Sequence, residues 1–202
     1  LKSWISSFFY SDVAIVNDPT LLGDGLSAGN DVTVDVAGNL AINAEFRATG
    51  LNVSLTTTGG ITSANAIEAA NLSVSAGSDV TLQTRVDSLS GNMTGSLNVT
   101  ETDGDLAIGA AGLTSAGDVS LTLGSIGASL NGTGSINVAG TVTLSTTAGI
   151  TLNAAAQIIG TNLTITAGDH VDVGTNVDRL AATLTGLPSN LTVVEADDLE
   201  IF

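Results

Sequence analysis

Apolar and small polar residues alternate along almost the whole chain in very short runs. The recurring pattern is an apolar residue, a small polar residue and a second apolar residue, as in Val32-Thr33-Val34 and Leu97-Asn98-Val99. The middle position holds Thr, Ser, Asn, Ala or an acidic residue each time. Because successive side chains of a strand point to opposite faces, the pattern predicts strands of about three to five residues with one face in a core and the other in water.

The spacing of these strands favours stacked coils over hairpins. Successive strand centres lie alternately about 8 and about 13–20 residues apart, so a pair of strands covers roughly 20–25 residues, and coils of that length can stack with equivalent strands about 4.8 Å apart. Only Asn131-Gly132 is an Asn-Gly dipeptide, the strongest signal of a two-residue hairpin turn. We therefore expect an all-β fold, a parallel β-helix (solenoid) with coils of about 20–25 residues.

A longer repeat lies over this short pattern. Asp12-Val13-Ala14-Ile15 returns as Asp105-Leu106-Ala107-Ile108 and as Asp198-Leu199-Glu200-Ile201, about 93 residues apart each time. Phrases between these marks also recur: 71–77 matches 162–168, and 86–89 matches 177–180. We expect each unit to form about four coils, with glycines at the corners supplying positive φ. The predicted organisation is a cap or docking segment at 1–11, repeat units at 12–104 and 105–197, and the start of a third copy at 198–202.

The aromatic residues gather at the two ends of the sequence. The segment 1–11 holds four of the six aromatic residues of the chain. Because the end of a β-helix exposes its core and unpaired strand edges, we expect this segment to cover an end or to pack against a neighbouring copy. The alternative is an ordinary edge strand. The possible end-to-end interface comprises Trp4, Phe8, Phe9, Tyr10, Leu199, Ile201 and Phe202.

The charge and composition of the chain narrow the classes of partner. The net charge is -16 with four basic residues, which disfavours binding to nucleic acid and to anionic membranes. No apolar run approaches the roughly 18 residues of a spanning helix, so we expect no membrane insertion. The absence of cysteine rules out disulfides and thiolate metal sites. The acidity suits a dispersed extracellular surface.

Candidate chemistry is sparse. The acidic corners Asp103-Gly104-Asp105 and Glu195-Ala196-Asp197-Asp198 offer oxygen ligands for weak Ca²⁺ binding, although solvated turns are the favoured interpretation. Their equivalent places in the two repeats indicate a structural role and not catalysis. His170 is the single histidine, so no Ser-His-Asp set is possible. We assign no catalytic, cofactor-binding or metal-binding residue and expect no enzyme activity.

Three phrases of the chain resemble a known family. Gly-Asn-Leu-x-Ile at 38–42, Thr-Thr-Gly-Gly-Ile-Thr at 57–62 and Ser-Ala-Gly-Asp-Val-x-Leu at 115–121 are similar to the repeat regions of filamentous-haemagglutinin-type exoproteins and autotransporter passengers. The resemblance covers about residues 12–202. It implies a right-handed β-helix, exported to the bacterial cell surface and used as an adhesin or stalk, and it carries over no catalytic residue.

Pattern and resemblance together lead to one expected function and one alternative. The first is a non-enzymatic structural module of an extracellular bacterial surface protein, an adhesin stalk or surface fibre. The alternative is a self-assembling filament subunit that joins end to end through its termini. The expected partners are neighbouring copies of the chain or adjacent repeats of a longer one.

Overall fold

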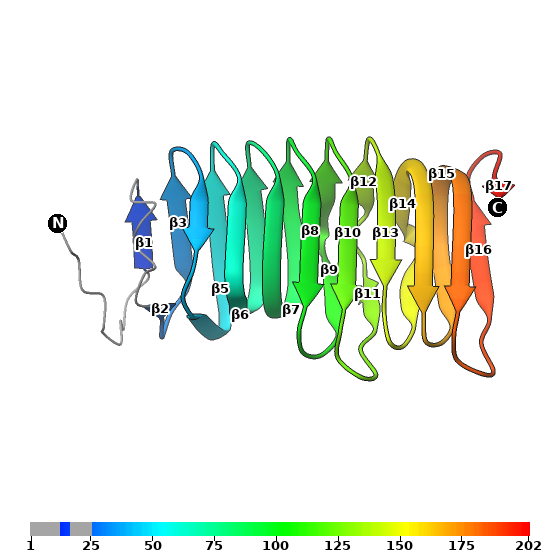
Figure 1. Ribbon diagram of the computed structural model, residues 1–202, viewed down its shortest axis with the longest axis horizontal. Coiled ribbons are helices and arrows are strands. Elements are labelled where there is room, and N and C mark those ends of the chain that lie inside the picture. Colours follow the sequence, from blue (N-terminus) through cyan, green and yellow to red (C-terminus); the bar gives the residue numbers. More distant parts are fainter. Residues whose placement is uncertain (1–12, 17–25) are drawn as a thin grey trace.

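The chain folds into a parallel β-helix, which confirms the predicted fold class (Figure 1). The computed structural model describes residues 13–16 and 26–202, and these form 17 strands and no helix. Every strand pairing among them is parallel, and β1 and β17 lie at opposite ends of the stack (Figure 1). The strands are β1 Val13–Val16, β2 Leu26–Ser27, β3 Val32–Val36, β4 Leu40–Ile42, β5 Phe46–Thr57, β6 Ile61–Ala76, β7 Val80–Met93, β8 Leu97–Glu101, β9 Leu106–Ser115, β10 Val119–Leu123, β11 Leu130–Gly132, β12 Ile136–Val138, β13 Thr141–Ser145, β14 Ile150–Ala167, β15 Val171–Leu184, β16 Leu191–Glu195 and β17 Glu200–Ile201.

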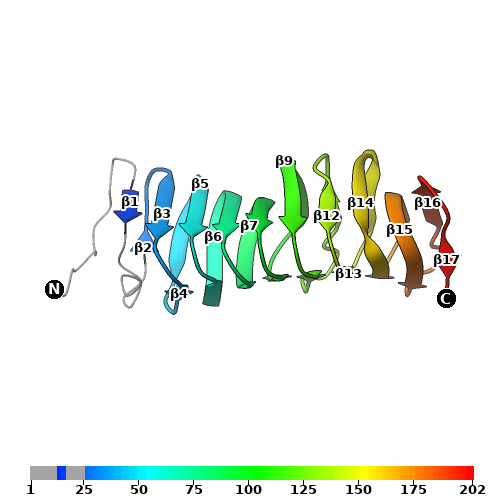
Figure 2. The same ribbon diagram turned by 90° about the horizontal axis from the view of Figure 1, so that it is seen from above.

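Two rows of strand segments run the length of the solenoid (Figure 2). Shorter rows at the corners pair in the same way, as from Leu26 through Phe46 and Ile67 to Thr84. Longer strands such as β6 and β14 turn a corner and so belong to both rows. The first row passes from Val13 through Val32, Val53, Leu72 and Leu89 to Ile108 of β9. Leu106 of the same strand continues this row through Leu130, Ile150 and Val171 to Leu191. The second row passes through Leu40, Ile61, Val80, Leu97, Val119, Val142, Leu163, Leu180 and Ile201.

A continuous hydrophobic core fills the space inside the coils. The outer two positions of the predicted triplets are buried, as at Val32 and Val34, while the middle position, as at Thr33, faces out. The buried side chains form one cluster that extends from Leu26 to Leu180. Phe46, the only aromatic residue of the predicted repeats, is fully buried and so offers no exposed ring to a ligand. The predicted facing of the strands is therefore confirmed wherever a further coil follows.

Coil length varies more than the spacing of triplets suggests. Register partners lie 17 residues apart at Leu72 and Leu89 but 24 apart at Leu106 and Leu130. The short coils occur where β7 continues round its corner as strand, because almost no residues are then left for loops.

Copies of two repeated phrases stand on opposite rows of the solenoid. Leu72 of the phrase at 71–77 belongs to the first row, whereas its counterpart Leu163 belongs to the second. Leu89 and its counterpart Leu180 are related in the same way. These copies are therefore separated by an odd number of half-turns, whereas the sequence predicts about four coils for each unit.

Most corner glycines are required by close packing of coils and not by positive φ. Gly38 and Gly104 do have positive φ, at 114° and 81°. At Gly77 and Gly168, in contrast, φ is ordinary, but a Cβ atom would overlap the backbone oxygen of the preceding coil, that of Thr58 or Thr147. The expectation of positive φ was wrong at these two corners, because the separation of neighbouring strands leaves no room there for a side chain.

Candidate functional site

Acidic and asparagine side chains at the corners hold successive coils together. The Oδ1 atom of Asp118 accepts a hydrogen bond from the backbone N–H of Thr141 at 2.7 Å, and that of Asp79 accepts one from Ser96 at 2.8 Å. Each bond joins the residue before one strand to the corresponding corner of the next coil, so these carboxylates satisfy backbone donors that the strand ladder leaves unpaired. The same contact occurs in the pairs Asp31–Asn52, Asn39–Gly60 and Asp105–Ser129.

A polar ladder borders a shallow groove on the outer side of the first row. The Asn71 side-chain N–H donates to Asn52 Oδ1 at 2.8 Å, and the Asn52 side-chain N–H donates to Asp31 Oδ2 at 2.9 Å. Bonds from the Asn52 side chain and backbone lower the pKa of Asp31. The groove is lined by small residues such as Ser54 and Ser73, and its amides are engaged with one another.

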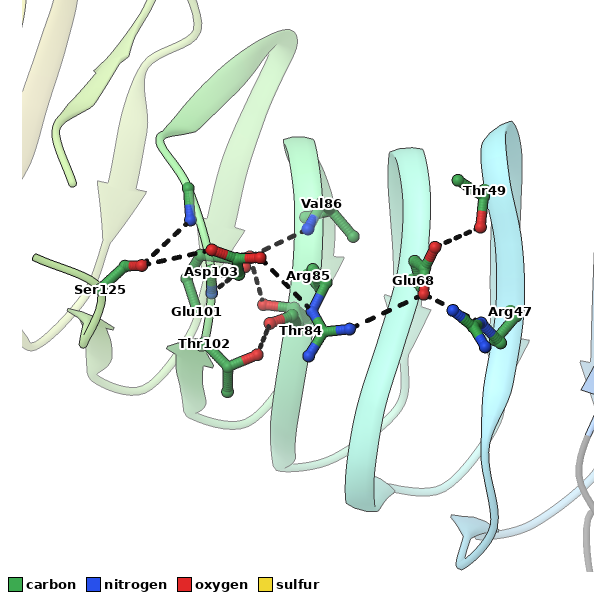
Figure 3. Close-up of polar contacts among 11 residues, drawn as sticks. Arg47, Thr49, Glu68, Thr84, Arg85, Val86, Glu101, Thr102, Asp103 and Ser125 are labelled. Carbon is green, nitrogen blue, oxygen red and sulfur yellow. Dashed lines mark hydrogen bonds and ion pairs between the residues drawn. The ribbon is translucent and has the colours of Figure 1, made fainter.

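A second ladder alternates in charge along one corner of the solenoid (Figure 3). Arg47, Glu68 and Arg85 are register partners in three successive coils. Arg47 Nε lies 3.1 Å from Glu68 Oε2, Arg85 Nη1 lies 3.8 Å from the same oxygen, and Arg85 Nε lies 4.0 Å from Asp103 Oδ2. A hydrogen bond from the Thr49 hydroxyl is the main cause of the lowered pKa of Glu68, and Arg47 and Arg85 contribute to it. Arg179 Nε lies 3.1 Å from Glu200 Oε2 of the next coil, so three of the four basic residues pair coils.

Glu101 is a carboxylate inside the core, next to this ladder (Figure 3). Its side chain is fully buried at the end of β8, and Leu123 of the following coil stands over it. Glu101 Oε2 accepts hydrogen bonds from the Thr84 hydroxyl at 2.9 Å and from the Val86 N–H at 3.1 Å, while Oε1 accepts one from the Asp103 N–H at 3.3 Å. Burial raises the pKa of Glu101, and these hydrogen bonds partly offset the increase.

The same arrangement of contacts recurs at another corner, near the end of the chain. Glu195, at the end of β16, accepts a hydrogen bond from the Thr175 hydroxyl at 2.6 Å and one from the Val177 N–H at 3.3 Å. The Ala196 N–H donates to Glu195 Oε1 at 3.0 Å. Glu195 is only partly buried because no described strand stands over it. The two corners therefore share one hydrogen-bond arrangement. A strand of the next coil covers Glu101, and no described strand covers Glu195.

Four of the six large apolar side chains exposed among the described residues lie on the last coil, and the other two, Ile126 and Leu187, lie in the loops after β10 and β15. The side chains of Leu191, Val194, Ile201 and Phe202 are 42%, 54%, 75% and 59% exposed. Leu191 and Ile201 occupy core-row positions, and no described strand pairs with them on the side away from β15. We call this surface, Leu191–Glu195 and Glu200–Phe202, the C-terminal face.

The predicted interface residues divide between described and undescribed parts of the chain. Ile201 and Phe202 are exposed on the C-terminal face, and the guanidinium of Arg179 lies 4.2 Å from the centre of the Phe202 ring. Leu199 is half-buried against the core. The other four predicted residues, Trp4, Phe8, Phe9 and Tyr10, lie outside the described residues.

The acidic corners considered for Ca²⁺ form contacts within the fold. Asp105 bonds the Ser129 N–H, Asp103 accepts a hydrogen bond from Ser125 Oγ at 3.4 Å, and Glu101 is buried. Across the described ranges, no three His, Cys, Asp or Glu side chains are grouped so as to hold a metal ion. His170 Nδ1 lies 2.6 Å from Asp169 Oδ1.

The glutamate corners were missed by the sequence analysis. Both glutamates end an alternating run, Leu97-Asn98-Val99-Thr100-Glu101 and Leu191-Thr192-Val193-Val194-Glu195. The alternation places both on the core side, and each lies 17 or 20 residues after a threonine. An acidic residue at a core position of a repeated pattern is the signal that identifies such a corner.

The chain matches no protein-family model, no curated protein and no solved structure. No helix long and apolar enough to cross a membrane occurs in the part of the chain that the structure describes.

Proposed function

We propose that the chain is a non-enzymatic structural module, a stiff solenoid segment of an extracellular bacterial surface protein that acts as an adhesin stalk or surface fibre. The observation that carries the proposal is the single core running from Leu26 to Leu180. Because each coil contacts only its neighbours, such a core supports length and stiffness along one axis.

The polar groups of the solenoid support the same function. The corner carboxylates, the Asp31–Asn52–Asn71 ladder and the Arg47–Glu68–Arg85 ladder all join one coil to the next. A net charge of -16 on the surface keeps such a strand-rich module dispersed and disfavours lateral association of its sheets.

The proposal is tested on intact cells of the source organism with gold-labelled antibodies raised against this chain. We expect gold particles on the outer surface of cells that have not been permeabilised. Labelling that requires permeabilisation contradicts an extracellular location. An antibody against a cytoplasmic protein of the same cells is the control for leakage.

A filament subunit is the second candidate. The exposed apolar side chains of the C-terminal face favour it, because an open end of a β-helix is a template for further strands. A head-to-tail contact of this type does not close on itself and generates fibres.

A further inference from the structure

The outer face of the second row carries hydroxyl side chains in two columns. In this row β8, β10 and β13 lie side by side with parts of β14 and β15 (Figure 1). Because alternate side chains face outward, each of these strands places two residues on the surface, in register with those of the next coil. One column is Thr100, Thr122, Ser145, Thr166 and Thr183, and the other is Asn98, Ser120, Thr143, Thr164 and Ala181. We call these ten residues the hydroxyl face.

The polar side chains of the hydroxyl face are not used to join coils. Within the described ranges, none of them forms a hydrogen bond or an ion pair with another part of the chain. The first row differs, since Asn71 donates to Asn52 and Asn52 to Asp31 on its outer side. Each hydroxyl can donate one hydrogen bond and accept two, so the face offers this whole capacity to its surroundings.

The hydroxyl face also carries no charge. None of the 20 acidic and four basic residues of the chain occupies one of its ten positions. The outer side of the first row, in contrast, includes Asp35 and Asp172. In a chain of net charge -16, a neutral face of this extent matches a neutral partner in charge and gives no attraction to an ionic one.

The two columns form a rectangular net. Successive coils repeat at about 4.8 Å, and the two outward positions of one strand lie about 6.7 Å apart. The oxygen atoms on a prism face of hexagonal ice lie on a rectangular net with similar repeats in both directions. Because the side chain of threonine is branched at Cβ and has few rotamers, its hydroxyl and methyl groups are held near fixed positions of the net.

We propose that the hydroxyl face binds the surface of ice. The hydroxyls take the places of water oxygens at the crystal surface, and the methyl groups fill the spaces between them. One hydrogen bond exchanged with water contributes little, but a rigid array makes many such contacts with little loss of conformational entropy. The inference goes beyond the stalk function, because it gives one side of the solenoid a specific partner.

The regularity of the net identifies the partner. A soluble sugar or peptide would contact a few neighbouring hydroxyls and needs no repeat over several coils. A crystal repeats in two directions, and the column from Thr100 to Thr183 is unbroken through five coils. Molecules bound in this way stop the addition of water beneath them, so ice grows only between them and the freezing point falls below the melting point.

The test measures the gap between the melting and freezing points of a single ice crystal in a solution of the 202-residue chain. We expect the wild type to open a gap and to give faceted crystals. Thr166→Lys places a long charged side chain in the unbroken column and should abolish both effects. Thr151→Lys is the matched control and should keep the wild-type gap, because Thr151 is an equally outward, exposed position of the same strand β14 in the first row.

Slow growth of ice from the same solutions gives a second readout. A protein that binds ice is incorporated into the growing crystal, whereas a dissolved protein is excluded from it. We expect incorporation of the wild type and of Thr151→Lys, and exclusion of Thr166→Lys. Far-ultraviolet circular dichroism verifies that both variants keep the β-structure of the wild type, so that a loss is assigned to the face and not to unfolding.

Two results would overturn the inference. The first is a wild type that opens no gap and is excluded from ice, and the second is an equal loss in Thr166→Lys and Thr151→Lys. If a wild type without ice binding is instead retained on insoluble cellulose, and only Thr166→Lys loses this retention, the face belongs to a neutral polysaccharide. Since the antibody experiment does not depend on ice binding, it tests the stalk function separately.

Discussion

At the scale of single residues, alternation decided which side chains are inside. The triplets place Val, Leu and Ile in the core and Thr, Ser and Asn outside in each coil that another coil covers. Period two alone is sufficient for this prediction, because a strand offers only two faces. The burial of Glu101 could not be predicted from its polarity, which indicates the surface. Its register position and its three hydrogen bonds hold the side chain inside.

A matched pair of substitutions tests the assigned facing. Val74 is buried on the core side of β6, and Thr164 is half-buried on the outer side of β14. We expect Val74→Asp to lower the free energy of unfolding by about 3 to 5 kcal/mol as an unpaired buried charge, and Thr164→Asp to be nearly neutral. Urea denaturation measures both, and equal losses would contradict the facing of these strands.

Glu101 should make the stability of the fold depend on pH. Because burial raises its pKa in the folded state, the folded protein binds this proton more tightly than the unfolded chain. The stabilisation is therefore full below the unfolded pKa and is lost as the pH rises through the folded pKa. Glu101→Gln removes this contribution while keeping an acceptor for Thr84 and Val86.

Urea unfolding of wild type and Glu101→Gln at several pH values between about 4 and about 7 measures the effect. We expect the variant to gain stability relative to the wild type as pH rises, by about 1.4 kcal/mol for each unit by which the pKa is raised. Asp172→Asn, on an outward-facing position, should show no such gain. A constant difference between Glu101→Gln and wild type at all pH values would argue against a perturbed carboxyl.

At the scale of the elements, the short parallel strands could be predicted from the sequence, but the hydrogen-bond partners of the corner residues could not. Asp118 stands directly before the triplet Val119-Ser120-Leu121 in the sequence, but its partner Thr141 lies a full coil away. A contact between residues 23 apart depends on coil length, and coil length varies. The corner acids therefore had the composition of a cation site in the sequence and the contacts of backbone caps in the structure.

The capping role of the corner acids is tested at Asp118. Asp118→Ala removes the acceptor for the Thr141 N–H and should lower the free energy of unfolding by about 1 kcal/mol. Asp118→Asn keeps an oxygen in the same position and should retain most of the stability. Amide hydrogen exchange at Thr141 provides the local readout, and unchanged protection in Asp118→Ala would show that the side chain does not cap this corner.

At the scale of the whole molecule, the sequence indicated a solenoid but not how its copies are arranged. Both rows are built from the same apolar-polar-apolar triplet, so a repeated phrase does not reveal which row it occupies. The copies at Leu72 and Leu163 fall on opposite rows for that reason. Some copies of the long repeat therefore change row, as Leu72 and Leu163 do, whereas Val13 and its counterpart Leu106 both lie in the first row.

The proposed role as stalk or fibre is tested most directly by the intact mass of the native protein together with negative-stain electron microscopy of the same sample. We expect thin particles much longer than they are wide. A mass of hundreds of kilodaltons in single rods would identify a segment of a large stalk, and a subunit near 19.9 kDa in long uniform fibres would identify a filament subunit. Compact, rounded particles of either mass would contradict both.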